Sequence, residues 1–232
     1  MSSDYKVSVI MSVYNSQNTV SDAIESILNQ THKQTELLIV DDFSEDNTVK
    51  IIKKYLTKYK NIKLFLNQKN IGLTKSLNLL LKEADGKFIA RQDADDISFP
   101  NRIENQINEM INKDLDFCTT RAYRKNKKNK IPGLSYYLPK KTLINFKNPF
   151  IHGTLMIKRS VINEIGKYDE DFYYSQDYKL MKDLLNHNFR YTILNKVHYE
   201  LNMDNNISTN KKSEQQYYAE CVKKNVKPEK LI

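Results

Sequence analysis

The segment Val7-Ser8-Val9-Ile10-Met11-Ser12-Val13 is an almost continuous apolar run, rich in β-branched side chains. Such a run predicts a strand buried on both faces, as in a parallel sheet covered by helices. The next apolar residues recur at helical spacing up to Asn29, and they are Val20, Ala23, Ile24, Ile27 and Leu28. This part of the chain therefore predicts a strand followed by a helix.

The same order of strand and helix repeats along the chain. The predicted pairs are strand Glu36 to Val40 with helix Val49 to Tyr59, strand Ile62 to Leu66 with helix Leu73 to Leu81, and strand Phe88 to Gln92 with helix Asn101 to Ile111. Regular alternation argues for right-handed crossovers. We therefore predict an α/β fold, a Rossmann-like, mainly parallel sheet with helices on both faces.

The pattern changes after the strand-like segment Leu115 to Thr120. Residues Tyr123 to Pro149 are basic and contain Pro132-Gly133, which predicts an irregular excursion or a flexible flap. The later predicted elements are strand Thr154 to Ile157, helix Arg159 to Ile165 and helix Asp177 to Leu185. Because there is no internal repeat or low-complexity linker, we expect one domain over residues 1–232.

Polar residues follow each of the first four predicted strands. They are Tyr14-Asn15, Asp41-Asp42, Asn67 to Gly72 and Asp93 to Asp96. Open parallel sheets bind ligands at the carboxyl ends of their strands. We therefore expect a binding site at this edge, although loops are also polar for reasons of solvation alone.

Asp93, Asp95 and Asp96 crowd three carboxylates at the end of one predicted strand. Like charges this close raise one another's pKa unless a cation shares the site. Oxygen ligands without Cys or His suit a hard cation such as Mg²⁺ or Mn²⁺ that bridges to substrate phosphates. The alternative is a solvated acidic turn that caps the next helix.

The composition is that of a globular protein, with 232 residues of which 40% are hydrophobic. The N-terminus lacks a signal-peptide pattern, and no apolar run reaches the ~18 residues of a membrane span. These features predict a cytoplasmic location. Cys118 and Cys221 have neither metal-ligand nor disulfide spacing, so both are expected to be free thiols.

The formal net charge of +9 indicates an anionic partner, and the basic residues are clustered. One cluster comprises Arg121, Arg124, Lys125, Lys127, Lys128 and Lys130, and a basic tail comprises Lys211, Lys212, Lys223, Lys224, Lys227 and Lys230. Such clusters favour peripheral contact with the anionic inner face of the cell membrane. The alternative is a solvated basic face.

The chain resembles the inverting glycosyltransferases of family 2, which have the glycosyltransferase-A fold. The resemblance runs from about Val7 to about Ser208 and rests on motifs in the family's order. These are the strand Val7 to Asn15, the run Val40-Asp41-Asp42-Phe43-Ser44, Asn70-Ile71-Gly72-Leu73, Arg91-Gln92-Asp93-Ala94-Asp95-Asp96, and Gly166-Lys167-Tyr168-Asp169-Glu170 with Gln176-Asp177. The resemblance implies a nucleotide-sugar-binding half, about residues 1–120, and an acceptor-side half with the basic tail, about residues 121–232.

The resemblance implies a role for individual residues. Donor binding, with a UDP-linked sugar, falls to Val13, Tyr14, Asn15, Asp42, Asn70, Gly72, Lys75, Arg91, Asp93 and Ala94. Asp95 would bind Mn²⁺ or Mg²⁺, and Asp177 would be the catalytic base. Contacts to the acceptor or the diphosphate fall to His152, Gln176, Tyr174 and Asn202.

The sequence departs from the family pattern in its last motif. Tyr199-Glu200-Leu201-Asn202 stands where many members have Tyr-Arg-x-His, so Asn202 replaces a histidine that assists the metal or the diphosphate in some members. His198 could substitute for that imidazole only if the local register differs. Asp177 has an alternative role as a helix cap, and Tyr174 one as a packing residue.

The resemblance implies transfer of a sugar to a glycan or glycolipid acceptor in bacterial surface polysaccharide synthesis. One alternative is a metal-dependent nucleotidyltransferase, but Tyr14 to Asn18 has no Gly-rich basic loop. Another is a non-enzymatic basic nucleic-acid-binding module, but no aromatic residues interleave the basic ones in a recognition motif. We therefore expect no nucleic-acid partner. The donor sugar, acceptor, linkage and oligomeric state are open at this level.

Overall fold

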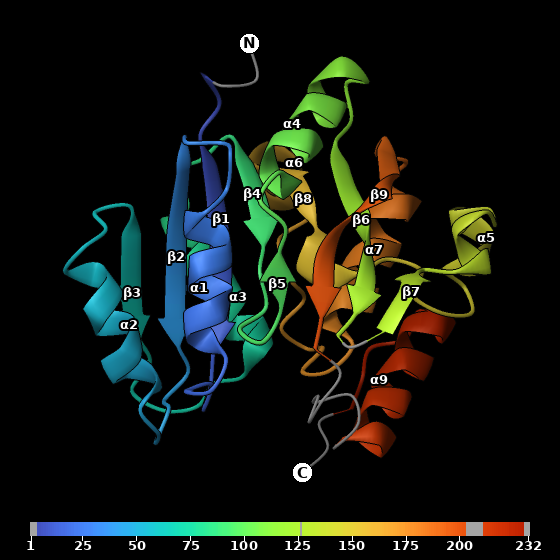
Figure 1. The fold of residues 1–232 in the computed structure, drawn as a ribbon. Helices are drawn as coiled ribbons and strands as arrows, with labels where there is room; N and C mark the ends of the chain where they lie inside the picture. The colour runs from blue at the N-terminus through green and yellow to red at the C-terminus, as the bar shows by residue number, and fades with distance from the viewer. Residues whose placement is uncertain (1–3, 126, 203–210, 230–232) are drawn as a thin grey trace.

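The described residues, 4–125, 127–202 and 211–229 of a computed structural model, are organised around a nine-stranded sheet (Figure 1). The strands lie in the order β3, β2, β1, β4, β8, β6, β9, β5, and β7 pairs with β6 outside this path. They are β1 (Val7–Val13), β2 (Thr35–Asp41), β3 (Ile62–Leu66), β4 (Phe88–Arg91), β5 (Ile97–Ser98), β6 (Phe117–Arg124), β7 (Lys127–Ile131), β8 (Met156–Lys158) and β9 (Tyr191–Leu201). The helices are α1 (Val20–Leu28), α2 (Thr48–Leu56), α3 (Leu73–Glu83), α4 (Arg102–Asn112), α5 (Lys140–Leu143), α6 (Arg159–Glu164), α7 (Gln176–Asn186) and α9 (Lys212–Lys224), with short 3-10 turns η2 (Leu134–Tyr136) and η3 (His152–Thr154).

Strands β3, β2, β1 and β4 form the parallel half of the sheet. β1 is buried along nearly its whole length, as its apolar run predicts. Helices α1, α2 and α3 make the crossovers that return each strand in the same direction. The carboxyl ends of these strands therefore meet at one edge, which is the lower edge in Figure 1.

The other half of the sheet is mixed. β8 is antiparallel to both β4 and β6, whereas β9 is parallel to β6 and β5 is antiparallel to β9. Helices lie on both faces, so the predicted α/β class is confirmed. The run of neighbouring parallel strands is limited to the first part of the chain, and β6 with β9 is the other parallel pair among the described strands.

The segment predicted as an irregular excursion, residues 123–149, contains more regular structure than expected. β6 continues to Arg124, and β7 folds back against it as an antiparallel partner. The sequence does not predict β7, because apolar and polar residues do not alternate in its sequence, Lys-Lys-Asn-Lys-Ile. Among the described strands β7 pairs only with β6, and lysines on such an edge discourage pairing with another chain.

Two apolar cores lie on opposite faces of the sheet. Consecutive residues of β1 and β2 alternate between them: Ile10 and Leu38 belong to one core, and Val9 and Leu37 to the other. The first core includes residues of α3, α6, α7 and α9, and the second includes residues of α1, α2 and α4. Both sides of the sheet are therefore packed, which holds its carboxyl edge rigidly.

Cys118 and Cys221 are buried free thiols, as expected. Cys118 lies in the interior on β6, where burial raises the pKa of its thiol to about 12. No helix within the described ranges is both long and apolar enough to cross a membrane.

The close approach of β1 to the loop before β4 gives the first prediction. A Cβ atom on Gly86 would lie 2.5 Å from the backbone nitrogen of Ser8 and 2.7 Å from its hydroxyl oxygen. Gly86→Ala should therefore lower the free energy of unfolding by about 1–3 kcal/mol, as overpacking of a tight interior does. Urea unfolding followed by circular dichroism measures the change.

Gly133→Ala is the matched control, because the nearest atom to its added Cβ is the Lys130 carbonyl oxygen at 3.9 Å. It should change stability far less than Gly86→Ala. Equal effects of the two substitutions would contradict the packing argument.

Candidate functional site

The carboxyl edge of β1, β2 and β4 gathers most of the residues that the sequence marks as donor-binding. Val13 pairs with Asp41 at the ends of β1 and β2, and Ile10 pairs with Arg91 at the end of β4. Among the predicted donor residues, Val13, Asp42, Gly72 and Arg91 are buried, Asp93 and Ala94 are half-buried, and Tyr14, Asn15, Asn70 and Lys75 are exposed. The fold thus brings four separate segments to one site.

Asp41 and Asp42 have different environments at the end of β2. Asp42 is 3% exposed, and its carboxylate accepts hydrogen bonds from Asn67 Nδ2 at 2.8 Å and from the backbone N–H groups of Ile71 at 2.9 Å and Gly72 at 2.8 Å. Asp41 is equally buried, but only its Oδ2 has a described partner, the N–H of Ser44. Its Oδ1 lacks one among the described residues. Asp42 therefore holds the loop after β3, whereas Asp41 Oδ1 is a buried acceptor without a described partner.

Asn15 links the loops that follow β1 and β2. It adopts a left-handed conformation with φ of 46°. Its N–H donates to Ser44 Oγ, and its Oδ1 accepts from the Glu45 N–H, both at 2.9 Å. Asn tolerates this backbone better than most residues, so Asn15 shapes the rim of the site. Tyr14 beside it is 49% exposed.

Tyr173 packs on Gly72 at the junction of the two halves of the chain. Gly72 has φ of +86°, and a Cβ atom there would lie 2.5 Å from the Tyr173 ring. Tyr173 is 45% exposed, whereas the ring of Tyr174 packs against Tyr218 at a centroid distance of 5.7 Å. The structure thus places Tyr173, more than the predicted Tyr174, on the open side of the site. Lys75 is exposed in the first turn of α3.

Arg91 anchors the aspartate motif. It is 1% exposed, and its Nη1 donates to the carbonyl oxygens of Ile10 and Gln92, both at 3.0 Å. Its Nη2 forms an ion pair with Asp93 Oδ1. Because a buried guanidinium is costly without such partners, this pair fixes the Asp93 carboxylate at the end of β4.

Burial and mutual repulsion raise the pKa values of the other two carboxyl groups. For Asp95, burial and then the charge of Asp93 raise the pKa to about 6. For Asp96, burial and then the charges of Asp93 and Asp95 raise the pKa to about 9. At neutral pH, Asp95 is therefore mainly ionised, whereas Asp96 is mainly a neutral acid.

Asp96 joins the aspartate motif to the end of β9. Its Oδ1 accepts a hydrogen bond of 2.7 Å from the backbone N–H of Asn202. Tyr199, on the same strand, accepts a hydrogen bond from the Asp93 N–H at its hydroxyl, at 3.1 Å. Asn202 therefore lies beside the motif, at 8% exposure. The resemblance extends to about Ser208, and residues 203–208 lie outside the described residues.

His198 does not take the place of the missing family histidine. His198 lies where the pairing of β9 with β6 shifts register, between the partners of Arg121 and Ala122. Its Nδ1 lies 3.2 Å from Asn101 Oδ1, and burial lowers the pKa of its imidazole to about 4.

The described residues contain no group of three or more His, Cys, Asp and Glu side chains placed to hold a metal ion. The carboxylates of this site therefore suit an ion that takes only one or two ligands from the protein. Asp95 offers a half-buried carboxylate, and Asp93 is committed on one oxygen to Arg91. Mg²⁺ and Mn²⁺ sites of one or two carboxylates completed by water and substrate phosphates match this donor set.

Asp177 lies in the first turn of α7, after Ser175 in a left-handed conformation with φ of 53°. Asn148 Nδ2 donates to Asp177 Oδ2 at 2.9 Å, while Asn148 Oδ1 accepts from the Phe150 N–H at 3.0 Å. The second bond orients the amide so that its NH₂ group faces the carboxylate. Burial raises the pKa of Asp177, and the nearby charge of Asp93 adds to this effect.

Two residues that the sequence does not single out, Gly153 and Asn148, complete the site together with Tyr168 of the Gly166 to Glu170 motif. Gly153 is required because its Cβ would lie 2.6 Å from both Asp93 Oδ2 and the Tyr199 hydroxyl. Tyr168 Oη lies 2.7 Å from His152 Nε2, and this hydrogen bond restricts rotation of the His152 ring. Asn148 orients Asp177. Their neighbours in sequence, His152 and the Gly166 to Glu170 motif, were the only signals that could have drawn attention to them.

Gln176 is buried at the first position of α7.

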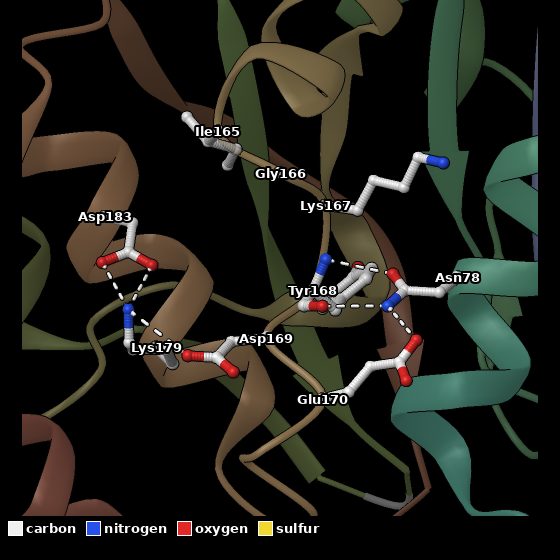
Figure 2. A pocket seen from close by; sticks show the side chains of 9 residues that line it. All are labelled: Asn78, Ile165, Gly166, Lys167, Tyr168, Asp169, Glu170, Lys179 and Asp183. Atoms are coloured by element: carbon white, nitrogen blue, oxygen red, sulfur yellow. Dashed lines mark hydrogen bonds and ion pairs between the residues drawn. The ribbon is translucent and has the colours of Figure 1, made fainter. Parts of the chain in front are cut away.

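A separate polar cavity of about 430 Å³ lies between α3 and α7 (Figure 2). Asn78 there donates to the Tyr168 carbonyl at 2.9 Å and to Glu170 Oε1 at 3.0 Å, and it accepts from the Tyr168 N–H. None of the strand-end carboxylates lines this cavity. The Gly166 to Glu170 motif therefore acts here as a brace between α3 and the segment that precedes α7.

The raised pKa of Asp96 gives a prediction of stability against pH. An unfolded aspartate titrates near pH 4, so between about pH 4 and 9 the folded chain binds more protons at this position than the unfolded chain. The free energy of unfolding should fall with rising pH, by roughly 1 kcal/mol per unit between pH 6 and 8. Asp96→Asn should flatten this decline, because the amide mimics the neutral acid.

Urea unfolding at pH 6, 7 and 8 with a chelator present measures the slope. Asp114→Asn, an exposed carboxylate on the loop before β6, should leave the slope unchanged. A decline that persists in Asp96→Asn would contradict the assignment.

Comparison with known proteins agrees with this architecture. The sequence model of glycosyl transferase family 2 matches residues 8–166. EpsE of Bacillus subtilis (strain 168) is 37% identical over 176 residues, which cover 72% of this chain and 62% of EpsE. The chain thus spans about three-fifths of the length of that relative.

Two further proteins are similar over most of the chain. A UDP-Glc:alpha-D-GlcNAc-diphosphoundecaprenol beta-1,3-glucosyltransferase, WfgD of Escherichia coli, is 35% identical over 80% of this chain and 72% of its own. The mannosyltransferase PcManGT from Pyrobaculum calidifontis, solved with GDP-Man and Mn²⁺, superposes with a TM-score of 0.74 at 17% identity, over 93% of this chain and 63% of that one. This likeness confirms the glycosyltransferase-A fold. With the family match over most of its length and the site at the carboxyl edge of its parallel strands, the chain belongs to glycosyl transferase family 2.

Proposed function

We propose that the chain transfers a sugar, with inversion, from a UDP-linked donor to a glycan or lipid-linked acceptor in bacterial surface polysaccharide synthesis. The observation that carries the proposal is that the fold brings Asp177 near enough to the aspartate motif for the charge of Asp93 to act on it. Asp177 and Asp93 are far apart in sequence, yet the charge of Asp93 contributes to the raised pKa of Asp177. A base and a donor-binding carboxylate in one site are what such a transfer requires.

The donor side offers groups that suit a nucleotide. Val13 ends β1 and Asp42 directly follows β2, so both would lie against the base and the ribose of the nucleotide. The exposed ring of Tyr14 and the partly exposed Asp93 lie at the ends of nearby strands, where they can contact the base and the ribose. WfgD, which carries a UDP-glucose donor in its name, supports the choice of UDP.

Asp95 would hold Mn²⁺ or Mg²⁺ together with the donor diphosphate. Bound there, the ion would supply Lewis-acid stabilisation of the charge that develops on the departing diphosphate. PcManGT, which shares the fold, was solved with Mn²⁺. Lys75, exposed at the start of α3, adds positive charge on the same side of the sheet.

Asp177 would accept the proton of the acceptor hydroxyl as that hydroxyl attacks the anomeric carbon. Its raised pKa makes the carboxylate a stronger base, and the Asn148 amide keeps one oxygen in a fixed direction. In this scheme, contacts to the acceptor or the diphosphate fall to His152, Gln176, Asn202 and the Tyr173-Tyr174 pair. A lipid-linked acceptor is supported by WfgD, whose name includes a diphosphoundecaprenol substrate.

The first test concerns the metal. Asp95→Asn should abolish the enhancement of UDP binding by Mn²⁺, because a neutral amide is a poorer ligand for a hard cation. Isothermal calorimetry of UDP binding with Mn²⁺ and with a chelator measures the enhancement. Asp114→Asn is the control and should retain it.

Equal UDP affinity with and without Mn²⁺ in the unsubstituted protein would rule out the metal assignment. A panel of nucleotide-sugars with Mn²⁺, followed by release of the free nucleotide, then identifies the donor.

The second test concerns the base. Asp177→Asn keeps the size of the side chain and can still accept the Asn148 hydrogen bond, but it cannot take up a proton. UDP affinity should survive, while turnover falls by roughly 10²–10⁴, the usual cost of losing a general base. Transfer rate, UDP affinity and melting temperature are measured on the same preparation.

Asp183→Asn on the same helix is the matched control, because Asp183 pairs with Lys179 outside the site. A capping role alone predicts about 1 kcal/mol of lost stability with turnover intact, and that result would reject Asp177 as the base.

Asn148→Ala removes a hydrogen bond that lowers the pKa of Asp177, so the acidic limb of the kcat/KM profile should move to higher pH.

A further inference from the structure

The segment of residues 134–146, which includes η2 and α5, exposes apolar side chains to an unusual degree. Leu134 is 87% exposed, Tyr137 74%, Phe146 68% and Leu138 51%. The first three are the most exposed large apolar side chains of the described residues. Single exposed apolar residues are normal, but a concentration within one short segment indicates an interaction surface.

The same segment is firmly attached to the body of the protein. The Tyr136 hydroxyl donates to the Ile193 carbonyl at 3.3 Å, and the Arg121 guanidinium lies 4.9 Å from the centre of the Tyr136 ring. The buried Lys140 ammonium donates to the carbonyls of Tyr136 and Leu138, both at 2.6 Å. Ile144 is 2% exposed. The outward side chains are therefore presented by an ordered scaffold.

The charge around this surface has one sign. Between Asp116 and Glu164 the sequence has no acidic residue, and it has eleven lysines and arginines. Lys127, Lys130, Lys141 and Lys147 are exposed, and none of them forms an ion pair with another described residue. The tail differs, because Lys211, Lys223 and Lys227 pair with Glu214, Glu220 and Asp171. Arg121 of the basic cluster is buried and bonded to Asn195.

We propose that residues 134–146 and the exposed lysines beside them dock on the surface of an anionic lipid bilayer. Leucine, tyrosine and phenylalanine side chains bury in the interface of a bilayer, while lysines pair with anionic headgroups. A second copy of the chain is a poorer occupant. A two-fold dimer would place this basic surface against itself, so that like charges would repel.

The surface adjoins the candidate base. Phe146 is separated from Asn148 by one residue, and Asn148 donates to Asp177. α5 stands at the outer edge of the molecule, beyond β6 and β7 (Figure 1). If the proposed function holds, docking through this segment would place the bilayer surface, and with it a lipid-linked acceptor, close to Asp177.

The chain has no tryptophan, which allows a direct test. Phe146→Trp places one fluorophore on the surface, and Tyr59→Trp places one at an exposed aromatic position that follows α2. Each variant of the full chain is titrated with phosphatidylglycerol vesicles and with phosphatidylcholine vesicles. Phe146→Trp should show a blue shift and quenching by brominated lipid with the anionic vesicles, and Tyr59→Trp should show neither.

Two sets of substitutions separate the apolar and the charged contributions in vesicle sedimentation. Replacing Leu134, Tyr137, Leu138 and Phe146 by Gln should weaken binding at least about tenfold. Replacing Lys127, Lys130 and Lys147 by Gln should weaken it about fivefold per lysine at low salt. The controls are Leu66→Gln with Ile111→Gln, and Gln at Lys50, Lys53 and Lys54 on α2, which should bind as the unsubstituted protein does.

Three results would overturn the proposal. The first is no spectral change of Phe146→Trp with anionic vesicles at low salt. The second is vesicle binding that is lost only in the lysine variant while Phe146→Trp stays unshifted. The third is a blue shift that grows with protein concentration in the absence of vesicles, which would assign the surface to a second copy. Vesicle binding needs no nucleotide, so it can succeed or fail independently of the UDP-binding and turnover tests.

Discussion

The ion pair between buried Arg91 and Asp93 is the interaction on which the architecture of the site depends. A guanidinium at 1% exposure is stable only because the carbonyls of Ile10 and Gln92 and the Asp93 carboxylate surround it. Ile10 lies in the middle of β1, and Gln92 and Asp93 directly follow β4, the strand that pairs with β1. The pair therefore ties the chemistry of the site to the register of the sheet.

The charge of Asp93 then differentiates the carboxylates around it. It contributes to the raised pKa values of Asp95, Asp96 and Asp177, in each case after burial. The outcome differs because the partners differ. Asp96 is enclosed by Asn202 and Tyr199 and serves as a neutral structural acid, whereas Asp95 remains open to solvent on one side. Three adjacent acidic residues thus acquire separate tasks from their surroundings.

The two halves of the chain meet through a few short-range contacts. Gly153 allows its backbone to pass beside Asp93 and Tyr199, Gly72 accommodates the ring of Tyr173, and Asn148 reaches Asp177. The contacts of Gly153 with Asp93 and of Gly72 with Tyr173 join the two halves, and the contact of Asn148 with Asp177 lies within the second half. Membrane docking through residues 134–146, as proposed, would act on the site through Asn148, which follows that surface directly.

Local patterns in the sequence were sufficient to predict the parallel half of the fold. The apolar run of β1, the helical spacing of α1 and the polar strand ends follow from side-chain period and burial, which neighbouring residues alone encode. The family motifs marked Asp93, Asp95 and Asp177 as candidates because they lie in recognisable local contexts, and their roles stay predictions. β7 was missed because its strand structure comes from pairing with β6, and its lysines show no apolar period.

Tertiary structure decided which hydrogen bonds each polar side chain makes. Asp41 and Asp42 are indistinguishable in the sequence, yet the loop after β3 saturates Asp42 and leaves Asp41 Oδ1 without a described partner. Likewise, only the register of β9 turns His198 away from the site and brings Tyr199 and Asn202 to the aspartates. The physical reason is that hydrogen bonds and pKa values depend on distances between atoms that are remote in sequence, whereas side-chain period depends only on neighbours.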